Sequence, residues 1–467
     1  MVLPDSPKCV VRRESVDAPT TGIRRSVAHA GVLVLPLSAS SRDALQRQLR
    51  LARALSSKLT THVEAASLCR AFAERCRPEG VHRTVLVAQS LDELRQQLAS
   101  PHRLHEAAVA GHPYDRPRLV FVCSGHGSQW RGMGQMLLDT ESAFREAVER
   151  CDAFVRERYG WSVLAALGGA GVCEEFDSVD VSQLCIATVQ LAFGALWRAW
   201  GITPDALVGH SLGEATACGL AGILSLEDTL TVVGERGAAL RDLQAEPGGM
   251  MVVTLPQGRT SIAVLQISRN LDLAAYNSWT SLVLSGGVDA LQRTEPQLRA
   301  EGFRTERVAV SYASHCAHVE AALHPLRTRL QHIMPQRGRV PVRGTSQEGW
   351  LVGPECGAEF WARNLRRPVL FRQAIQALVS SGPAVFVEVS PHPVLLDAVA
   401  QTLELDEGEL LTLASGSRDN ERRTLLTSLA RLYSLGFAVD WRVVGNTHGA
   451  PAPHPFAHAL EGVFGAR

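Results

Sequence analysis

Residues 208 to 214 of the chain are Val208-Gly209-His210-Ser211-Leu212-Gly213-Glu214. An apolar run precedes this stretch, and an Ala/Leu-rich helical pattern, Ala215 to Leu224, follows it. A Gly-x-Ser-x-Gly pattern between a strand and a helix is typical of a nucleophile elbow, a sharp turn that exposes the serine hydroxyl. The glycines allow the backbone to crowd around such a turn. We therefore predict that Ser211 is a nucleophile that becomes acylated; the alternative is a Gly/Ser loop without chemistry.

Length and composition indicate a multidomain globular protein. The chain has 467 residues, of which 46% are hydrophobic and 20% charged, which is too long for a single core. Its 47 acidic and 47 basic residues leave no net charge to favour nucleic acid or membrane. The ten cysteines lack metal-ligand spacing, and no run of eighteen apolar residues occurs. We therefore expect no metal, no membrane span and a cytoplasmic location. Lys8 and Lys58 are the only lysines, and such a preference for arginine is typical of a GC-rich bacterial genome.

The order of strand-like and helix-like patterns predicts an α/β fold with an α/β-hydrolase-like parallel-sheet core. Within it, a βαββαβ pattern predicts a ferredoxin-like insert. The expected segments are a flexible tail (1–30), a small α/β linker domain (31–112), the large α/β unit (118–248 and 318–402), the ferredoxin-like insert (249–317) and a C-terminal part that wraps back (403–467).

A serine nucleophile requires a base, and the chain contains sixteen histidines. We predict His315, because it lies where the chain leaves the insert and rejoins the elbow-bearing unit, which is a cleft position. His210, His318 and His392 remain alternatives. No motif indicates an acidic third member, which favours a Ser/His dyad whose imidazole is held by a backbone carbonyl.

Two backbone NH groups are candidates for an oxyanion hole. The NH of Leu212 follows from elbow geometry. The NH of His126 lies in a glycine-flanked turn after a predicted strand, and such turns either bind anions or merely connect elements. Arg236 follows the nucleophile by twenty-five residues on a predicted helix. It is either a surface side chain with a packed stem or a guanidinium that pairs with a substrate carboxylate.

These motifs together resemble the acyltransferase domain of modular polyketide synthases, which make antibiotics among other products. They resemble more distantly malonyl-CoA:acyl carrier protein transacylase. The resemblance covers nearly the whole chain, with 32–112 and 415–456 similar to the linkers before and after the acyltransferase. Its motifs are the opening turn within 119–136, Gly209-His210-Ser211-Leu212-Gly213-Glu214, the strand pair Ala275 to Gly286, Phe360-Trp361-Ala362-Arg363-Asn364-Leu365 and Phe386 to Pro393.

The resemblance implies a two-step ping-pong transfer without a tightly bound cofactor. Ser211, deprotonated by His315, would take the acyl group from acyl-CoA and pass it to the phosphopantetheine thiol of an acyl carrier protein. The resemblance also implies that the backbone of His126 and Leu212 forms the oxyanion hole, and that a carbonyl near Ser381-Gly382 holds His315. The side chains that it assigns to substrate binding are Arg236, His210, Asn277 and Gln129.

The resemblance also bears on the substrate. Arg236 falls where the family's arginine pairs with the free carboxylate of malonyl-type units, and starter-loading relatives usually lack it. Tyr312-Ala313-Ser314 before His315 resembles the methylmalonyl-type signature, since malonyl-type members more often show His-Ala-Phe-His. Ser314 in place of Phe leaves room for an α-methyl group, which is worth about 1 to 3 kcal/mol. We expect an α-carboxyacyl-CoA, methylmalonyl before malonyl.

Three other functions remain open, and so does the context of the chain. The alternatives are a starter-loading acyltransferase, a serine thioesterase or hydrolase with the same dyad, and a non-catalytic scaffold for carrier proteins. His126 stands where glutamine is usual, and Leu184 follows Gln183 where proline is common. No ketosynthase ending is visible before Val32, so we expect a discrete enzyme serving polyketide synthase modules in trans, the front of a loading module, or an excised domain.

Overall fold

The computed structural model describes residues 31–76, 80–100, 107–108, 116–168, 174–243, 247–404 and 412–444, together with residues 456, 460 and 463. The predicted tail, 1–30, lies outside the described residues. Three sheets organise the described chain: one of three strands, one of six and one of four.

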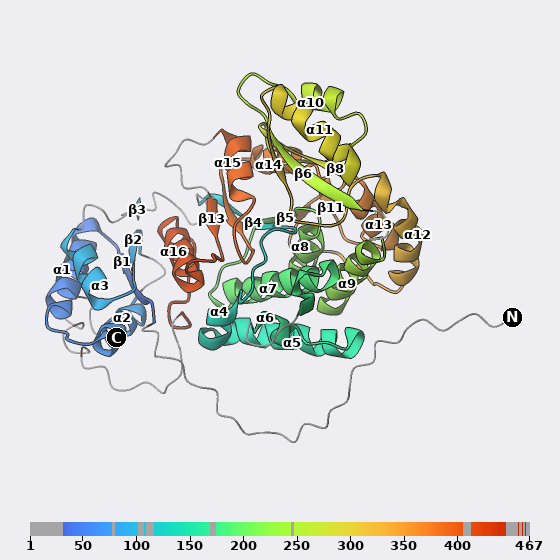
Figure 1. Cartoon of the computed structure of the whole chain (residues 1–467). Coiled ribbons are helices and arrows are strands. Elements are labelled where there is room, and N and C mark those ends of the chain that lie inside the picture. Colours follow the sequence, from blue (N-terminus) through green and yellow to red (C-terminus); the bar gives the residue numbers. More distant parts are fainter. Residues whose placement is uncertain are drawn as a thin grey trace. The chain divides into compact units, whose positions relative to one another are not determined.

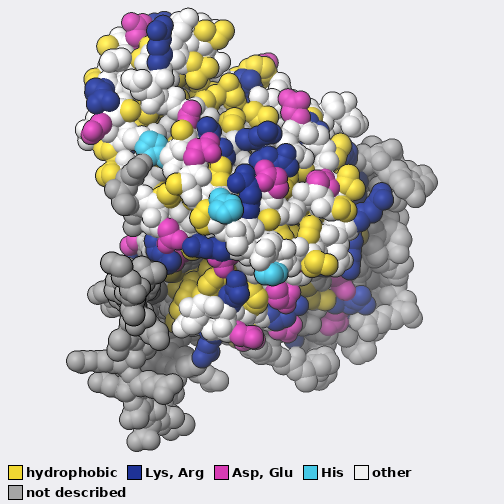
Figure 2. Space-filling model, turned by 90° about the vertical axis from the view of Figure 1, so that its right-hand side faces the viewer, with side chains coloured by type: hydrophobic (Ala, Val, Ile, Leu, Met, Phe, Trp, Pro, Cys, Tyr) yellow, Lys and Arg dark blue, Asp and Glu magenta, His cyan; other side chains and the backbone are white. Residues whose placement is uncertain are grey.

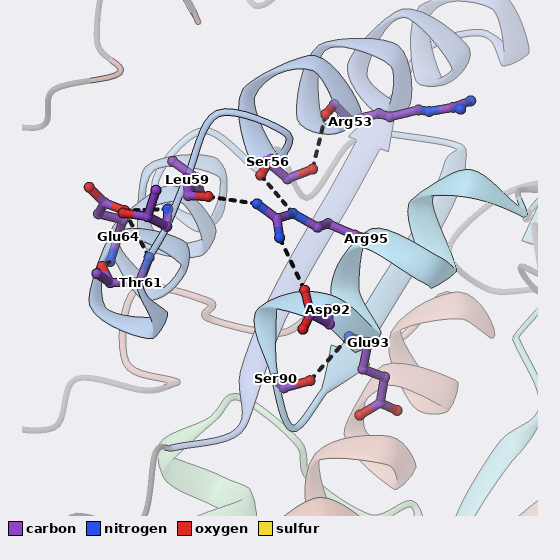
Figure 3. Close-up of polar contacts among 10 residues, drawn as sticks. Arg53, Ser56, Leu59, Thr61, Glu64, Ser90, Asp92, Glu93 and Arg95 are labelled. Carbon is purple, nitrogen blue, oxygen red and sulfur yellow. Dashed lines mark hydrogen bonds and ion pairs between the residues drawn. The ribbon is translucent and has the colours of Figure 1, made fainter.

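The first sheet is antiparallel and has the order β1-β2-β3, with β1 (Leu33–Ala39), β2 (His82–Ala88) and β3 (Ala107–Ala108). Its helices are α1 (Arg42–Ser56), α2 (His62–Ala73) and α3 (Leu91–Ala99). Side-chain contacts fix the helix ends, as Figure 3 shows. Thr61 and Glu64 form a capping box at the start of α2. Arg95 of α3 donates to the carbonyls of Ser56 (3.2 Å) and Leu59 (2.6 Å), which ties α3 to the end of α1.

The six-stranded sheet is the core of the large α/β unit (Figure 1). Its order is β11-β10-β5-β4-β12-β13, and every pair is parallel except β10 with the edge strand β11. The strands are β4 (Arg118–Cys123), β5 (Ala206–Gly209), β10 (Val342–Arg343), β11 (Trp350–Leu351), β12 (Ala384–Glu388) and β13 (Thr412–Ala414). Apart from Arg118 at the start of β4, the central strands β4 and β5 are apolar and buried, as expected for a parallel sheet covered on both faces. Ligands bind beyond the carboxyl ends of such strands.

Helices cover this sheet on both faces. They are α4 (Gln135–Thr140), α5 (Ser142–Tyr159), α6 (Val163–Leu167), α7 (Val179–Ala199), α8 (Gly213–Ala221), α9 (Leu226–Asp242), α12 (Glu320–Arg329), α13 (Ala358–Arg366), α14 (Phe371–Val379), α15 (Leu396–Leu403) and α16 (Glu421–Ser434). Two short 3₁₀ helices, η3 (Glu174–Asp177) and η4 (Ala317–Val319), precede α7 and α12. Helix α7 is the one helix of the described chain that is long and apolar enough to cross a membrane. However, 83% of its apolar stretch is buried inside the protein. It packs against α5 and α9 as the centre of the core.

The third sheet is inserted between α9 and η4. It contains β6 (Gly248–Thr254), β7 (Asp272–Tyr276), β8 (Ser281–Gly287) and β9 (Arg304–Arg307), and its helices are α10 (Ser261–Ile267) and α11 (Val288–Ala300). The strand order is β7-β8-β6-β9 with all pairs antiparallel, and α10 and α11 lie on the same side of it (Figure 1). This is the predicted ferredoxin-like arrangement.

The C-terminal part contacts the first sheet. Arg423 of α16 pairs with Glu93 at 2.7 Å, and Arg83 of β2 donates to the carbonyl of Phe437 at 3.2 Å. The hydroxyl of Tyr433 lies 2.9 Å from the Cys76 sulfur. Helix α16 therefore connects the small α/β linker domain, which contains the first sheet, to the large α/β unit. It contacts the large unit through α4 and β13.

Charge is mixed on the exposed face shown in Figure 2, where basic and acidic side chains alternate. The neighbouring helices α9, α12 and α13 carry such pairs, for example Arg366 with Glu320 and Arg329 with Asp242. This mixing agrees with a net charge of zero.

Candidate active site

The turn between β5 and α8 is a nucleophile elbow. Ser211 has a left-handed backbone with a φ of 56°, and it is flanked by β5 ending at Gly209 and α8 beginning at Gly213. A β-carbon on Gly209 would lie 2.2 Å from the Glu214 nitrogen, and one on Gly213 would lie 2.0 Å from the carbonyl oxygen of Cys123. Because real β-carbons never approach backbone atoms so closely, glycine is required at both positions. The elbow interpretation of this motif is confirmed by its backbone geometry.

A buried carboxylate, that of Glu214, connects the elbow to two distant segments of the chain. Glu214 is fully buried. It accepts hydrogen bonds from the backbone NH of Thr345 (2.6 Å) and from the side-chain amide of Asn364 (2.8 Å). The Thr345 hydroxyl also donates to the carbonyl of Gly209 at 2.6 Å, and the same Asn364 amide donates to the carbonyl of Ser211 at 3.3 Å. Both ends of the turn are thus held by the segment that follows β10 and by α13, which are distant in the sequence.

His315 lies beside the nucleophile, as predicted from its place at the end of the insert. Its Nε2 is 2.7 Å from Ser211 Oγ. The ring is held from behind, because Nδ1 lies 2.7 Å from the carbonyl oxygen of Arg367, the residue that caps the C-terminus of α13. A carbonyl can only accept, so Nδ1 carries the proton and Nε2 is free to accept from the serine hydroxyl. His318 and His392 make no such contact.

The carbonyl implied at Ser381-Gly382 is a wrong assignment. The supporting carbonyl belongs to Arg367, fourteen residues earlier, because the C-terminal end of α13 packs beside His315. Arg367 is the C-cap residue of α13 and its backbone is extended, so its carbonyl lies outside the helical hydrogen bonds and can accept from His315. This end of α13 can therefore orient His315 and stabilise its protonated form, as an acidic residue does in a triad.

Burial and the neighbouring guanidinium keep His315 neutral. Burial, followed by the charge of Arg236, lowers the pKa of His315 to about 3. His315 is 3% exposed. The imidazole is therefore uncharged at neutral pH, which is the state a general base requires.

Arg236 is a buried cation in contact with the nucleophile. Its side chain is only 4% exposed, so the interpretation as a surface side chain is wrong. Nη2 donates to Ser211 Oγ at 2.8 Å, and Nη1 donates to Gln183 Oε1 at 3.1 Å. No acidic side chain pairs with Arg236 among the described residues, and its Nε has no hydrogen-bond partner there. Burial lowers its pKa to about 10, so the guanidinium remains charged at neutral pH and can bind an anion.

The turn after β4 passes close to Ser211. A β-carbon built on Gly125 would lie 3.6 Å from the Ser211 β-carbon. Within this turn, the NH of Gly127 donates to Gln129 Oε1 at 2.7 Å, and Gln129 Nε2 lies 2.8 Å from His126 Nε2. The Gln129 amide is therefore the donor to His126, which places the His126 proton on Nδ1.

Both predicted oxyanion donors are available in this arrangement. The NH groups of His126 and Leu212 donate no hydrogen bond within the described chain, so both can bind a ligand. The side chain of His126 adds a third donor, because its Nδ1 is buried without a partner. Burial and the charge of Arg236 lower the pKa of His126 to about 4, so this ring also stays neutral.

The remaining predicted site residues flank or contact the elbow, His126 and His315. His210 Nε2 lies 2.8 Å from Asn277 Oδ1, a contact between the elbow and the β7–β8 hairpin. The Tyr312 ring meets the His126 ring edge to face, with centroids 6.1 Å apart. Ser314 is buried and its hydroxyl lies 3.5 Å from the Met250 sulfur. Ala313 is buried as well.

Sequence reasoning missed the residues that support the site. They are Gln183, Glu214, Thr345, Asn364 and Arg367. Two of them, Glu214 and Asn364, stand inside the motifs quoted for the resemblance. A polar residue inside an apolar strand or helix pattern was the signal that could have found them.

Comparison with known proteins identifies the class to which this fold and site belong. The family model described as the acyl transferase domain matches residues 120–439, and the chain belongs to this family. Polyketide synthase GfsB of Streptomyces halstedii is 38% identical over 416 residues, which cover 87% of this chain but 7% of that protein. The chain therefore spans a small part of the curated relatives that it matches.

Solved structures support the same assignment. The acyltransferase domain from module 8 of the salinomycin polyketide synthase superposes with a TM-score of 0.77 at 31% identity, covering 88% of this chain and 98% of that one. A loading acyltransferase from the avermectin modular polyketide synthase superposes with a TM-score of 0.63 at 33% identity, covering 68% of this chain and 99% of that one. The predicted fold class and the resemblance to polyketide synthase acyltransferase domains are thereby confirmed.

Proposed function

We propose that this chain transfers an α-carboxyacyl group from coenzyme A to the phosphopantetheine thiol of an acyl carrier protein, through an ester on Ser211. The observation that carries the proposal is the Arg236 guanidinium. It is buried, it has no acidic partner among the described residues, and it touches the nucleophile. A buried, unpaired charge is costly unless a ligand compensates it. A carboxylate on the acyl group would supply that compensation next to the reacting carbon.

In the first step the serine is acylated. Ser211 Oγ attacks the thioester carbonyl while its proton moves to His315 Nε2. The carbon–sulfur bond then breaks, and the same proton leaves with the thiol of coenzyme A. The Arg367 carbonyl keeps the proton on Nδ1 throughout, so that Nε2 performs both transfers.

The second step reverses the first with another thiol. His315 Nε2 takes the proton of the phosphopantetheine thiol, and the sulfur attacks the ester carbon. The carbon–oxygen bond of the ester breaks, and Ser211 Oγ recovers its proton from Nε2. The acyl group leaves as a thioester of the carrier protein, so atoms and charges balance without any cofactor.

Both steps pass through a tetrahedral oxyanion. The unpaired NH groups of His126 and Leu212 are the donors that we assign to it. Loss of one such donor costs about a hundredfold to a thousandfold in rate. Water must be excluded from the ester in between, and the burial of His315 and Arg236 supports this requirement.

For the extender unit we propose methylmalonyl, followed by malonyl. The support is Ser314, a small buried side chain directly before the base, together with the Tyr312-Ala313-Ser314 signature. A starter-loading acyltransferase is the second candidate, which the likeness to a loading acyltransferase favours. Arg236 separates the two, since a plain acyl group has no carboxylate to neutralise it.

The proposal is tested by intact-protein mass spectrometry after brief incubation with methylmalonyl-CoA, malonyl-CoA and acetyl-CoA in separate reactions. We expect carboxylated adducts on the wild type and none on Ser211→Ala. Arg236→Ala should lose the preference for carboxylated donors by roughly tenfold to a hundredfold, the value of a charged hydrogen bond. An acetyl adduct without carboxylated ones would establish starter loading instead. Release of free acid without any adduct would establish a hydrolase.

A further inference from the structure

A small cavity lies where the chain passes between the large unit and the ferredoxin-like insert. It is lined by Leu240 of α9, by Leu243, which caps the C-terminus of α9, by Tyr312 and Ala313 of the returning segment, and by His318 of η4. Its volume is about 10 Å³, which is room for about one water molecule or one methyl group. Three of the five lining side chains are purely aliphatic, so the cavity suits an alkyl group.

The cavity continues the surface that carries Arg236. Arg236 and Leu240 are four residues apart on α9, so their side chains share one face of the helix, and the C-cap residue Leu243 follows three residues later with a helical backbone. At a rise of about 1.5 Å per residue, Leu240 is about 6 Å further along the axis than Arg236.

Tyr312 connects the cavity to the reaction centre. Besides lining the cavity, it interacts electrostatically with Arg236 and hydrogen-bonds Gln183, the residue that holds the guanidinium. Its ring also meets that of His126 in the oxyanion turn. The cavity is therefore one side chain away from the site proposed for the substrate carboxylate.

The chemistry of an α-substituted unit fits this spacing. The carboxylate and the α-substituent are bonded to the same carbon. When the carboxylate is bound to Arg236, the α-substituent must therefore lie close to Arg236. This cavity is an aliphatic space about one helical turn along α9 from Arg236.

One wall of the cavity is rigid and the other is made of side chains. Gly248 at the start of β6 packs against the backbone of the Tyr312-Ala313 segment, since a β-carbon there would lie 2.6 Å from the Ala313 nitrogen. This wall cannot retreat without moving β6. On the other wall, Leu240 is fully buried, whereas Leu243 is half-buried at the rim. The two leucines are therefore the side chains whose size sets the room available.

We infer that this cavity receives the α-substituent of the acyl group, and that Leu240 and Leu243 limit the substituent to about the size of a methyl group. This inference rests on the proposed function, because it needs an acyl group on Ser211 and a carboxylate on Arg236. It assigns the size limit to α9, in addition to the segment before His315.

The test is a competition between malonyl-CoA and 2-propylmalonyl-CoA in equal amounts, with the two Ser211 adducts resolved by intact-protein mass spectrometry. Leu243→Ala and Leu240→Ala each remove three carbons from the wall. We expect each to raise the propylmalonyl-to-malonyl adduct ratio at least tenfold, since each methylene in such a pocket is worth about tenfold or more. Leu230→Ala is the matched control, because Leu230 is a buried leucine of α9 that does not line the cavity.

A variant that makes the cavity smaller tests the assignment independently of any loss of folding in the alanine variants. Leu243→Phe fills the rim, and we expect it to lower the methylmalonyl-to-malonyl ratio about tenfold. Ratios that stay within twofold of the wild type in Leu243→Ala and Leu243→Phe, while malonyl adducts still form, would overturn the cavity assignment and leave the proposed function intact. A wild type that forms no carboxylated adduct would instead overturn the proposed function itself.

Discussion

The two side chains that meet at the reaction centre both stand on left-handed backbone, but the chain produces this geometry in different ways. Ser211 has a φ of 56° and His315 a φ of 59°, and Glu404 is the one other non-glycine residue with positive φ in the described chain. Such a conformation costs of order 1 to 3 kcal/mol and persists only where the surroundings impose it. At Ser211 a glycine stands two residues away on each side, and both glycines are required by close backbone contacts. The segment Ala313-Ser314-His315-Cys316 contains none.

What holds His315 comes from far along the sequence. Its NH donates to the carbonyl of Leu365 at 2.9 Å, and its Nδ1 bonds the carbonyl of Arg367 at 2.7 Å. Both carbonyls belong to the end of α13, about fifty residues later. The glycines that the nucleophile's turn requires thus lie within two residues of Ser211, whereas the base has no glycine beside it and depends on the docking of another helix.

The first way to probe this comparison is to remove each reacting group. Ser211→Ala should abolish the acyl-enzyme and lower the transfer rate by about ten-thousandfold or more, because Ser211 is the hydroxyl that contacts the base. His315→Ala should lower acylation by about a hundredfold to ten-thousandfold, the usual value of a positioned base. Single-turnover acylation with methylmalonyl-CoA measures both. Equal activity of His315→Ala and the wild type would show that another group is the base.

The second prediction concerns the local encoding of the elbow. Gly213→Ala places a β-carbon 2.0 Å from the carbonyl oxygen of Cys123, and we expect a loss of about 3 kcal/mol or more in the free energy of unfolding. Gly357→Ala is the control, because a β-carbon there meets nothing within 4 Å and its φ of −83° suits any residue. Urea unfolding measures both. A Gly213→Ala protein as stable as the control would mean that the elbow is not constrained as described.

The difference between the elbow, which its own glycines mark, and the base, which a distant helix holds, explains what could be predicted from the sequence. The elbow, its strand and its helix follow from Gly209, Gly213 and the apolar runs around them, and the βαββαβ pattern gave the insert. The position of His315 followed from chain order. The carbonyl behind it did not, because a backbone oxygen carries no sequence signal, and the burial of Arg236 depends on α7 and α9 packing together.

The third prediction tests the long-range support of the elbow. Asn364 of α13 donates to the carbonyl of Ser211 and to Glu214. Asn364→Ala should leave both without this donor and lower the acylation rate about tenfold, for a loss of about 1 to 2 kcal/mol. Arg363→Ala, one residue earlier on the outer side of the same helix, is the control and should change the rate less than twofold. Equal rates for the two variants would show that α13 positions the base but not the nucleophile.

The smallest effect is expected in the pH dependence, and it separates a buried base from an exposed one. With a pKa of about 3, His315 stays neutral from pH 8 to pH 5, so kcat/KM for acylation should change less than twofold over this range. If the base were a histidine with its ordinary pKa of about 6.5, kcat/KM would fall about thirtyfold by pH 5.

The lowered pKa of His315 also affects stability. Below about pH 6.5 the unfolded chain binds a proton that the folded chain does not, so the free energy of unfolding falls as the pH decreases. Because the charge of Arg236 is the second cause of the shift, after burial, Arg236→Met should move the acid limb of the rate profile to higher pH. A wild-type limb near pH 6.5 would mean that the base is exposed to water, and that the end of α13 does not bury it as the structure indicates.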